Sequence, residues 1–108
     1  SGLEELIESL HIPGLEFCSH KIAIRFFNGK IKYPDFIFVG THKVIEVNGY
    51  FHYPKFTGVS NKSHEDYLTS SYHDAGYDCL VIWDTEIESD LSAVMQKILT
   101  FKSSEAIR

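Results

Sequence analysis

The apolar residues of the chain fall into short runs whose spacing changes along the sequence. In residues 3–10 they recur at helical spacing, and Pro13-Gly14 ends this segment. The runs that follow are short and rich in β-branched and aromatic residues, which favours strands. The pattern therefore predicts one short amphipathic helix at the start, followed by a group of strands beginning with residues 15–18.

The next feature is a hairpin signal. Residues 21–27 and 30–33 flank Asn28-Gly29, a pair that suits a type I′ turn between two strands. The polar positions of this hairpin are basic, and Lys30 and Lys32 carry part of that charge. A solvated strand face accounts for them, and a ribbon that faces phosphate is the alternative.

Two neighbouring strands are expected at residues 33–38 and 43–48, joined by a turn at residues 40–42. Each carries one carboxylate, Asp35 in the first and Glu46 in the second. Either acid alone could face solvent, and Asp35 could cap a turn. Adjacent strands lie about 4.8 Å apart, so two carboxylates at matching heights would repel unless a cation lay between them. Mg²⁺ binds at such oxygen-rich sites.

The second half of the chain predicts a helix, a buried strand, a turn and a last helix. They are expected at residues 63–75, 79–83, 84–86 and 91–101, with Tyr67, Leu68 and Tyr72 facing inward from the first helix. Ser60 or Ser63 is expected to cap that helix, and Gly76 to end it. The order α-β-β-β-α-β-α predicts an α/β (α+β) fold with a mixed four- to five-stranded sheet and helices on both faces.

Length and composition narrow the class of protein. A chain of 108 residues with 44% hydrophobic residues predicts one globular domain. No apolar run has the roughly 20 residues of a membrane span, so we expect an intracellular protein without a membrane partner. Cys18 and Cys79 lack the spacing of a zinc site and are interpreted as buried thiols. The net charge of −5 argues against a stand-alone nucleic-acid binder.

Several short motifs occur together in a recognisable order. They are Pro34-Asp35, Glu46-Val47-Asn48-Gly49, His52, the acidic helix that follows, and Gly76-Tyr77-Asp78-Cys79-Leu80-Val81-Ile82-Trp83. In this combination the chain resembles the PD-(D/E)XK nuclease superfamily, and within it the very-short-patch repair endonucleases and the phage homing endonucleases with an E-D-x-H-D signature. The resemblance extends from the first helix through Trp83, and implies a restriction-endonuclease-like core and a phage or bacterial origin.

The resemblance also implies site residues. Asp35 matches the principal metal-ligating aspartate, His52 the catalytic histidine, and Glu4 the N-terminal glutamate, with Glu8 as its substitute. Asp66 or its neighbour Glu65 matches the acid of the following helix, where His64 is a further candidate. Val47 stands where a backbone carbonyl would complete the metal shell, and Glu46 is a further metal ligand, directly or through water. The alternatives are that Glu4 and Glu8 are solvated surface acids and that His52 has a structural role.

Two departures from the family pattern change the expected chemistry. Asn48 stands where the superfamily has lysine, so His52 would have to activate the water in its place. Tyr50 and the missing cysteines remove the structural zinc site of the repair enzymes, so no zinc is expected. The implied cofactor is one or two Mg²⁺ ions.

The leading hypothesis is a Mg²⁺-dependent endodeoxyribonuclease, of homing or mismatch-repair type, that hydrolyses phosphodiester bonds in DNA. Residues 1–108 would form its catalytic domain within a longer protein that has a separate DNA-binding region, and the domain could act as a homodimer. The alternative is a catalytically inactive nuclease-like fold that binds DNA or protein. A third possibility is a small metal-binding protein.

Overall fold

Strand β5 (Lys43–Asn48) lies inside a four-stranded mixed sheet with the order β1-β4-β5-β6. It pairs antiparallel with β4 (Phe36–Phe38) and parallel with β6 (Asp78–Trp83). Strand β1 (Leu15–Phe17) pairs antiparallel with β4 at the edge. The structure is a computed structural model that describes residues 2–49 and 58–105. The predicted α/β class and mixed sheet are confirmed.

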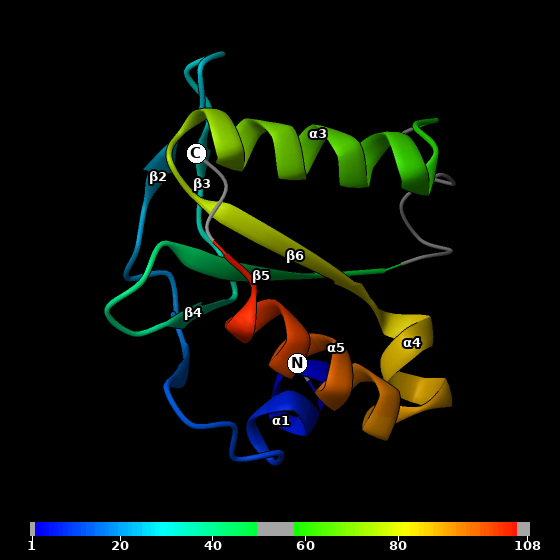
Figure 1. Ribbon diagram of the computed structural model, residues 1–108. Coiled ribbons are helices and arrows are strands. Elements are labelled where there is room, and N and C mark those ends of the chain that lie inside the picture. Colours follow the sequence, from blue (N-terminus) through cyan, green and yellow to red (C-terminus); the bar gives the residue numbers. More distant parts are fainter. Residues whose placement is uncertain (1, 50–57, 106–108) are drawn as a thin grey trace.

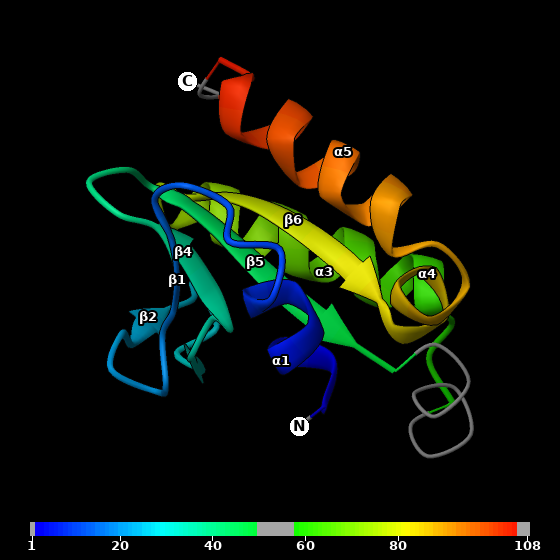
Figure 2. The same ribbon diagram turned by 90° about the horizontal axis from the view of Figure 1, so that it is seen from below.

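Helices cover both faces of this sheet, as predicted. Helix α3 (Asn61–Asp74) connects β5 to β6 and lies on one face, while α1 (Gly2–Glu8), α4 (Asp84–Ser89) and α5 (Leu91–Ser103) lie on the other (Figures 1 and 2). Successive residues of a strand point to opposite faces. Val44 therefore packs with Leu68 and Tyr72 of α3, whereas Ile45 packs with the residues of the opposite face.

The hairpin forms, but with another turn. Strands β2 (Ile24–Arg25) and β3 (Ile31–Lys32) pair antiparallel as a separate two-stranded sheet. A type I′ turn needs positive φ at both central residues, and Asn28 is not among the residues with positive φ; Gly29, at +85°, is. The Gly29 N–H bonds Phe26 O and the Phe26 N–H bonds Lys30 O. This geometry is a three-residue loop whose last residue needs the freedom of glycine.

The first helix is shorter than predicted. It ends at Glu8, so Leu10 lies in the following turn, and Leu6 is largely exposed although its spacing placed it on the apolar stripe. Ile7 is fully buried, and Leu3 and Leu10 pack against the core. The apolar spacing thus identified the contacts with the core and missed the end of the helix.

The predictions for α3 are confirmed except at one inward position. Ser60 caps the helix, because its hydroxyl accepts the Ser63 N–H at 3.1 Å. Leu68 and Tyr72 are buried, whereas Tyr67 is exposed.

The turn predicted at residues 84–86 is wrong, because helix α4 occupies this segment. Glu86 reaches back to accept the Trp83 N–H at 2.9 Å, which satisfies a donor at the start of the helix. Ile87 is buried against α1 and α5. None of the helices in residues 2–49 and 58–105 has the length and apolar character needed to cross a membrane.

Candidate active site

Asp35 is fixed at the start of β4 by three hydrogen bonds. Its N–H donates to Ile45 O at 3.0 Å, and its carbonyl oxygen accepts the Cys18 N–H at 2.8 Å. Its Oδ2 accepts the Val47 N–H at 2.7 Å. The preceding Pro34 is buried, and proline restricts the backbone before the aspartate. The carboxylate is therefore held on stiff backbone between the ends of β4 and β5.

Glu46 lies opposite Asp35. Asp35 bonds both neighbours of Glu46 in β5, through its N–H to Ile45 O and through its carboxylate to the Val47 N–H, so it lies beside Glu46. Only 3% of Glu46 is exposed, and Tyr72 donates its hydroxyl hydrogen to Glu46 Oε2 at 2.5 Å. Lys32 Nζ lies 4.0 Å from Glu46 Oε1. The matching heights expected from the sequence are thus present, and Glu46 is already held by a phenol and an ammonium group.

Burial and neighbouring charges shift both carboxyl groups in the same direction. Burial raises the pKa of Glu46 to about 7; Lys32 and the Tyr72 hydroxyl oppose the rise and the charge of Asp35 adds to it. Burial also raises the pKa of Asp35, with the Val47 N–H opposing the rise and Glu4 adding to it. The charge of Asp35 makes Glu46 harder to ionise, and a cation beside the two carboxyl groups would lower both pKa values.

The N-terminal acids are separated by the fold. Glu4 of α1 is close enough to Asp35 for its charge to raise the pKa of that group. Glu8 is exposed and lines a different cavity, together with His11 and Phe17. Of these two candidates, the structure places Glu4 beside Asp35 and Glu8 away from it.

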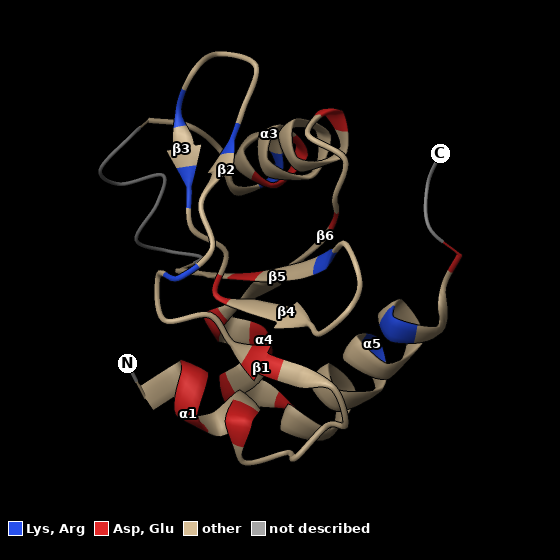
Figure 3. Cartoon of the chain, turned by 90° about the vertical axis from the view of Figure 1, so that its left-hand side faces the viewer, with Lys and Arg blue, Asp and Glu red and all other residues tan. Residues whose placement is uncertain are grey.

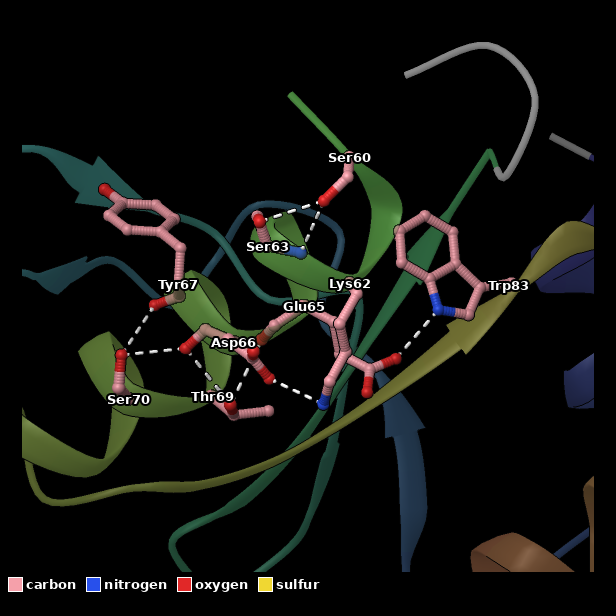
Figure 4. A network of polar contacts seen from close by, with 9 residues as sticks. All are labelled: Ser60, Lys62, Ser63, Glu65, Asp66, Tyr67, Thr69, Ser70 and Trp83. Carbon is pink, nitrogen blue, oxygen red and sulfur yellow. Dashed lines mark hydrogen bonds and ion pairs between the residues drawn. The ribbon is translucent and has the colours of Figure 1, made fainter. Parts of the chain in front are cut away.

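The acids of α3 are likewise separated (Figure 4). Glu65 Oε1 accepts the indole N–H of Trp83 in β6 at 2.8 Å. Asp66 is exposed and forms a surface ion pair with Lys62 at 2.8 Å. If α3 contributes an acid to the site, Glu65 is the better placed of the two, because it points toward the sheet.

His64 is the buried histidine of α3, with 6% exposed. Its ring stacks near Tyr67, with the ring centroids 6.3 Å apart, and lies 6.5 Å from the ring of Trp83. Burial lowers its pKa, and the charge of Lys32 lowers it further. The imidazole is therefore neutral at physiological pH.

Lys32 and Tyr72 are the residues whose role the sequence did not reveal. Lys32 was assigned to a solvated or phosphate-facing strand, yet it is partly buried and acts electrostatically on Asp35, Glu46 and His64. The alternation of side chains along the hairpin was the signal for this placement. Lys32 pairs with Ile24, and residues that pair across two strands point to the same face, so the burial of Ile24 means that Lys32 points inward. The structure supplies a lysine near the acids although Asn48 replaces the one expected on β5.

The remaining candidates are placed as follows. The Val47 N–H binds Asp35, while the role predicted for its carbonyl stays a prediction. Asn48 Nδ2 is buried and has no hydrogen-bond partner within the described part of the chain. His52 and Tyr50 lie outside the described residues.

The thiols have no role in this site. Cys18 is buried, as predicted, and Cys79 is partly buried; both are free. Burial and the nearby carboxylates raise the pKa of Cys18 to about 11 and that of Cys79 still higher, so both remain protonated at neutral pH.

The donor set suits a hard cation without enclosing one. Among residues 2–49 and 58–105, no three carboxylate, imidazole or thiol groups converge into a metal cage. Asp35 and Glu46 are nonetheless oxygen donors whose pKa values burial raises, and the residues described make no hydrogen bond to Asp35 Oδ1. Mg²⁺ is usually held by one or two carboxylates with several waters retained, so this pair fits it.

No protein-family model, no curated protein and no solved structure matches this sequence.

Proposed function

We propose that this domain is a Mg²⁺-dependent nuclease that hydrolyses phosphodiester bonds in DNA, with Asp35 at the centre of its site. The observation that supports the proposal most strongly is the Asp35–Glu46 pair: Asp35, just before β4, bonds both neighbours of Glu46 in β5, and Lys32 lies beside Glu46. Burial makes it costly to ionise these two acids, and the raised pKa values of both express that cost. Binding a cation would offset it.

In this proposal Asp35 holds the metal, with Glu46 as a second oxygen donor, directly or through water. When bound, Mg²⁺ would neutralise the charge that develops on the phosphoryl oxygens. The ammonium group of Lys32 adds positive charge on the side of Glu46. Tyr72 orients Glu46 through its hydroxyl group. His52, through its resemblance to the catalytic histidine, would accept the proton of the attacking water.

The test is incubation of the purified domain with supercoiled plasmid and Mg²⁺, with EDTA as the control. We expect nicked or linear plasmid with Mg²⁺ and none with EDTA. Asp35→Asn, prepared in parallel, controls for a contaminating nuclease. Intact plasmid across a range of Mg²⁺ concentrations, or equal cleavage by the variant, would overturn the proposal.

The second candidate function is binding without catalysis. The partners of Glu46 favour it, because Tyr72 and Lys32 already compensate this carboxylate without a metal. Under this candidate the domain would bind DNA fragments in EDTA and leave plasmid intact with Mg²⁺. The homodimer, the intracellular location and the phage or bacterial origin stay predictions.

A further inference from the structure

A polar pocket lies between the β2–β3 hairpin and α3, next to the carboxylate pair. Its volume is about 260 Å³, and Phe26, Lys30, Lys32, His64 and Tyr67 are among its lining residues. Lys30 and Lys32 both line it from the hairpin side. Two ammonium groups, an imidazole and a phenol thus surround one cavity in a chain whose overall charge is negative.

The basic residues of this region are concentrated on the hairpin, and among the described residues Lys32 has an ion-pair partner, Glu46, whereas Lys30 and Arg25 have none. The basic residues of the hairpin lie together on and around β2 and β3, while acidic residues dominate α1 and the sheet edge near it (Figure 3). Within the part of the chain that the structure describes, Lys30 and Arg25 form no ion pair, and Arg25 bonds only the Gly29 carbonyl, at 3.4 Å. Lys30 therefore adds an unpaired cation to the cavity, beside the Lys32 that Glu46 partly neutralises, and an unpaired cation favours an anionic occupant.

The hairpin also exposes an aromatic ring. Phe27, in the loop between the two strands, is 86% exposed, the largest exposure among the large apolar residues described. It lies in sequence between Arg25 and Lys30. An aromatic ring beside cations is the combination that binds nucleic-acid strands, because bases stack on the ring while the cations follow the phosphates. Free phosphate has no base that could stack on this ring.

We propose that this pocket binds a backbone phosphate of a DNA strand, with Phe27 stacking on an exposed base of the same strand. The phosphate is distinct from the one that is hydrolysed. Lys32 both lines the pocket and lies 4.0 Å from Glu46, so a strand held there passes beside the carboxylates. The inference rests on the proposed function for its substrate class, and it adds the element that positions the strand.

Lys30→Ala tests the pocket, because Lys30 lines it and has no ion pair to lose within the described residues. Lys97→Ala of α5 is the control for the change of charge, on the opposite face of the sheet, and it also removes the ion pair with Glu86. Binding of labelled single-stranded and duplex DNA is measured by fluorescence anisotropy in EDTA, after thermal melting has confirmed that both variants fold. We expect Lys30→Ala to weaken binding about 3- to 10-fold and to reduce the salt dependence by about one counterion. Lys97→Ala should match wild type.

Phe27 is tested with two variants. Phe27→Ala should weaken binding of single strands by about 5-fold or more, and Phe27→Leu, which keeps an apolar side chain, should behave in the same way if stacking is the cause. Val39→Ala, an exposed apolar residue on another turn, is the control and should match wild type. Unchanged binding by Phe27→Ala would overturn the stacking.

The source of the phosphate is tested by competition. Inorganic phosphate, added at constant ionic strength, should displace DNA only weakly. Three results would each overturn the proposal. They are equal binding of DNA by Lys30→Ala and Lys97→Ala, no saturable DNA binding up to millimolar concentrations of strand, and binding of inorganic phosphate alone. Because these measurements exclude metal, they are separate from the plasmid test. A domain that binds through Lys30 and leaves plasmid intact refutes only the nuclease, and one that cleaves without needing Lys30 refutes only the pocket.

Discussion

The carboxylate of Asp35 accepts a hydrogen bond from the backbone N–H of Val47. A side chain just before β4 thus bonds the backbone of β5 near the end of that strand. This relationship separates two roles of Asp35. The oxygen that accepts the bond supports the fold, and the negative charge is what a metal would need.

Asp35→Asn and Asp35→Ala should therefore differ in stability and agree in activity. The amide oxygen of an asparagine at this position can still accept the Val47 N–H, whereas alanine leaves that donor unpaired, at a cost of about 1–3 kcal/mol. We expect both variants to lose metal-dependent cleavage and only Asp35→Ala to lose stability. Urea denaturation and plasmid nicking measure the two effects. Wild-type cleavage by Asp35→Asn would remove Asp35 from the mechanism.

Glu46 should make stability depend on pH. Its pKa is raised from 4.5 to about 7, so the folded state binds its proton more tightly than the unfolded state does. The free energy of unfolding should then fall as the pH rises from about 4.5 through about 7, by at most about 3 kcal/mol from this group. Glu46→Gln should remove this component. The difference between variant and wild type, followed by urea denaturation from pH 4 to 8, isolates it, and a flat difference would refute the shift.

Tyr72→Phe should cost more stability at high pH than at low pH. The hydroxyl hydrogen bond helps to keep Glu46 ionised, and hydrogen bonds to charged groups contribute about 1.5–3 kcal/mol against about 0.5–1.5 for neutral ones. The loss in unfolding free energy should therefore be larger at pH 8 than at pH 5. Tyr77→Phe is the control, because within the described residues its hydroxyl makes no hydrogen bond. An equal loss at both pH values would contradict the coupling.

Glu65 and Asp66 form a matched pair for testing α3. Glu65→Ala removes an acceptor from the Trp83 indole and should cost about 1–3 kcal/mol. Asp66→Ala removes an ion pair between two exposed side chains and should leave stability almost unchanged. Trp83 is the single tryptophan of the chain, so its fluorescence emission should shift in the first variant alone. If Asp66→Ala abolished cleavage while Glu65→Ala spared it, the choice of Glu65 over Asp66 would be wrong.

His52→Ala tests the general base. If the imidazole accepts the proton of the attacking water, cleavage by wild type should decline as the pH falls below its reference pKa of about 6.5. The variant should lose about 10²–10⁴-fold in single-turnover rate and keep its Mg²⁺ binding. Isothermal titration on the same protein measures the metal, and near-normal cleavage would exclude His52 from catalysis.

The sequence by itself determined the elements that depend on local patterns. The β-branched runs of β5 and β6, the Ser60 cap and the stop at Gly76 are short-range signals, and each was predicted. The placement of Asp35 beside Glu46 followed as well, because a short turn between two adjacent strands fixes their register. Local signals failed where a tertiary contact decided: α4 forms because Ile87 has a core to enter.

Only the tertiary structure decided which charges meet. Lys32 and Glu46 are far apart along the chain, and nothing in the pattern of β3 identifies the acid that its lysine approaches. The choice between Glu65 and Asp66 depends on how α3 is rotated against the sheet. Glu4 and Glu8 share one side of α1, so the choice between them depends on which turn of the helix lies beside Asp35. Helical spacing fixes which residues share a side, while packing fixes what that side faces, because a rotation by one residue turns a side chain by about 100°.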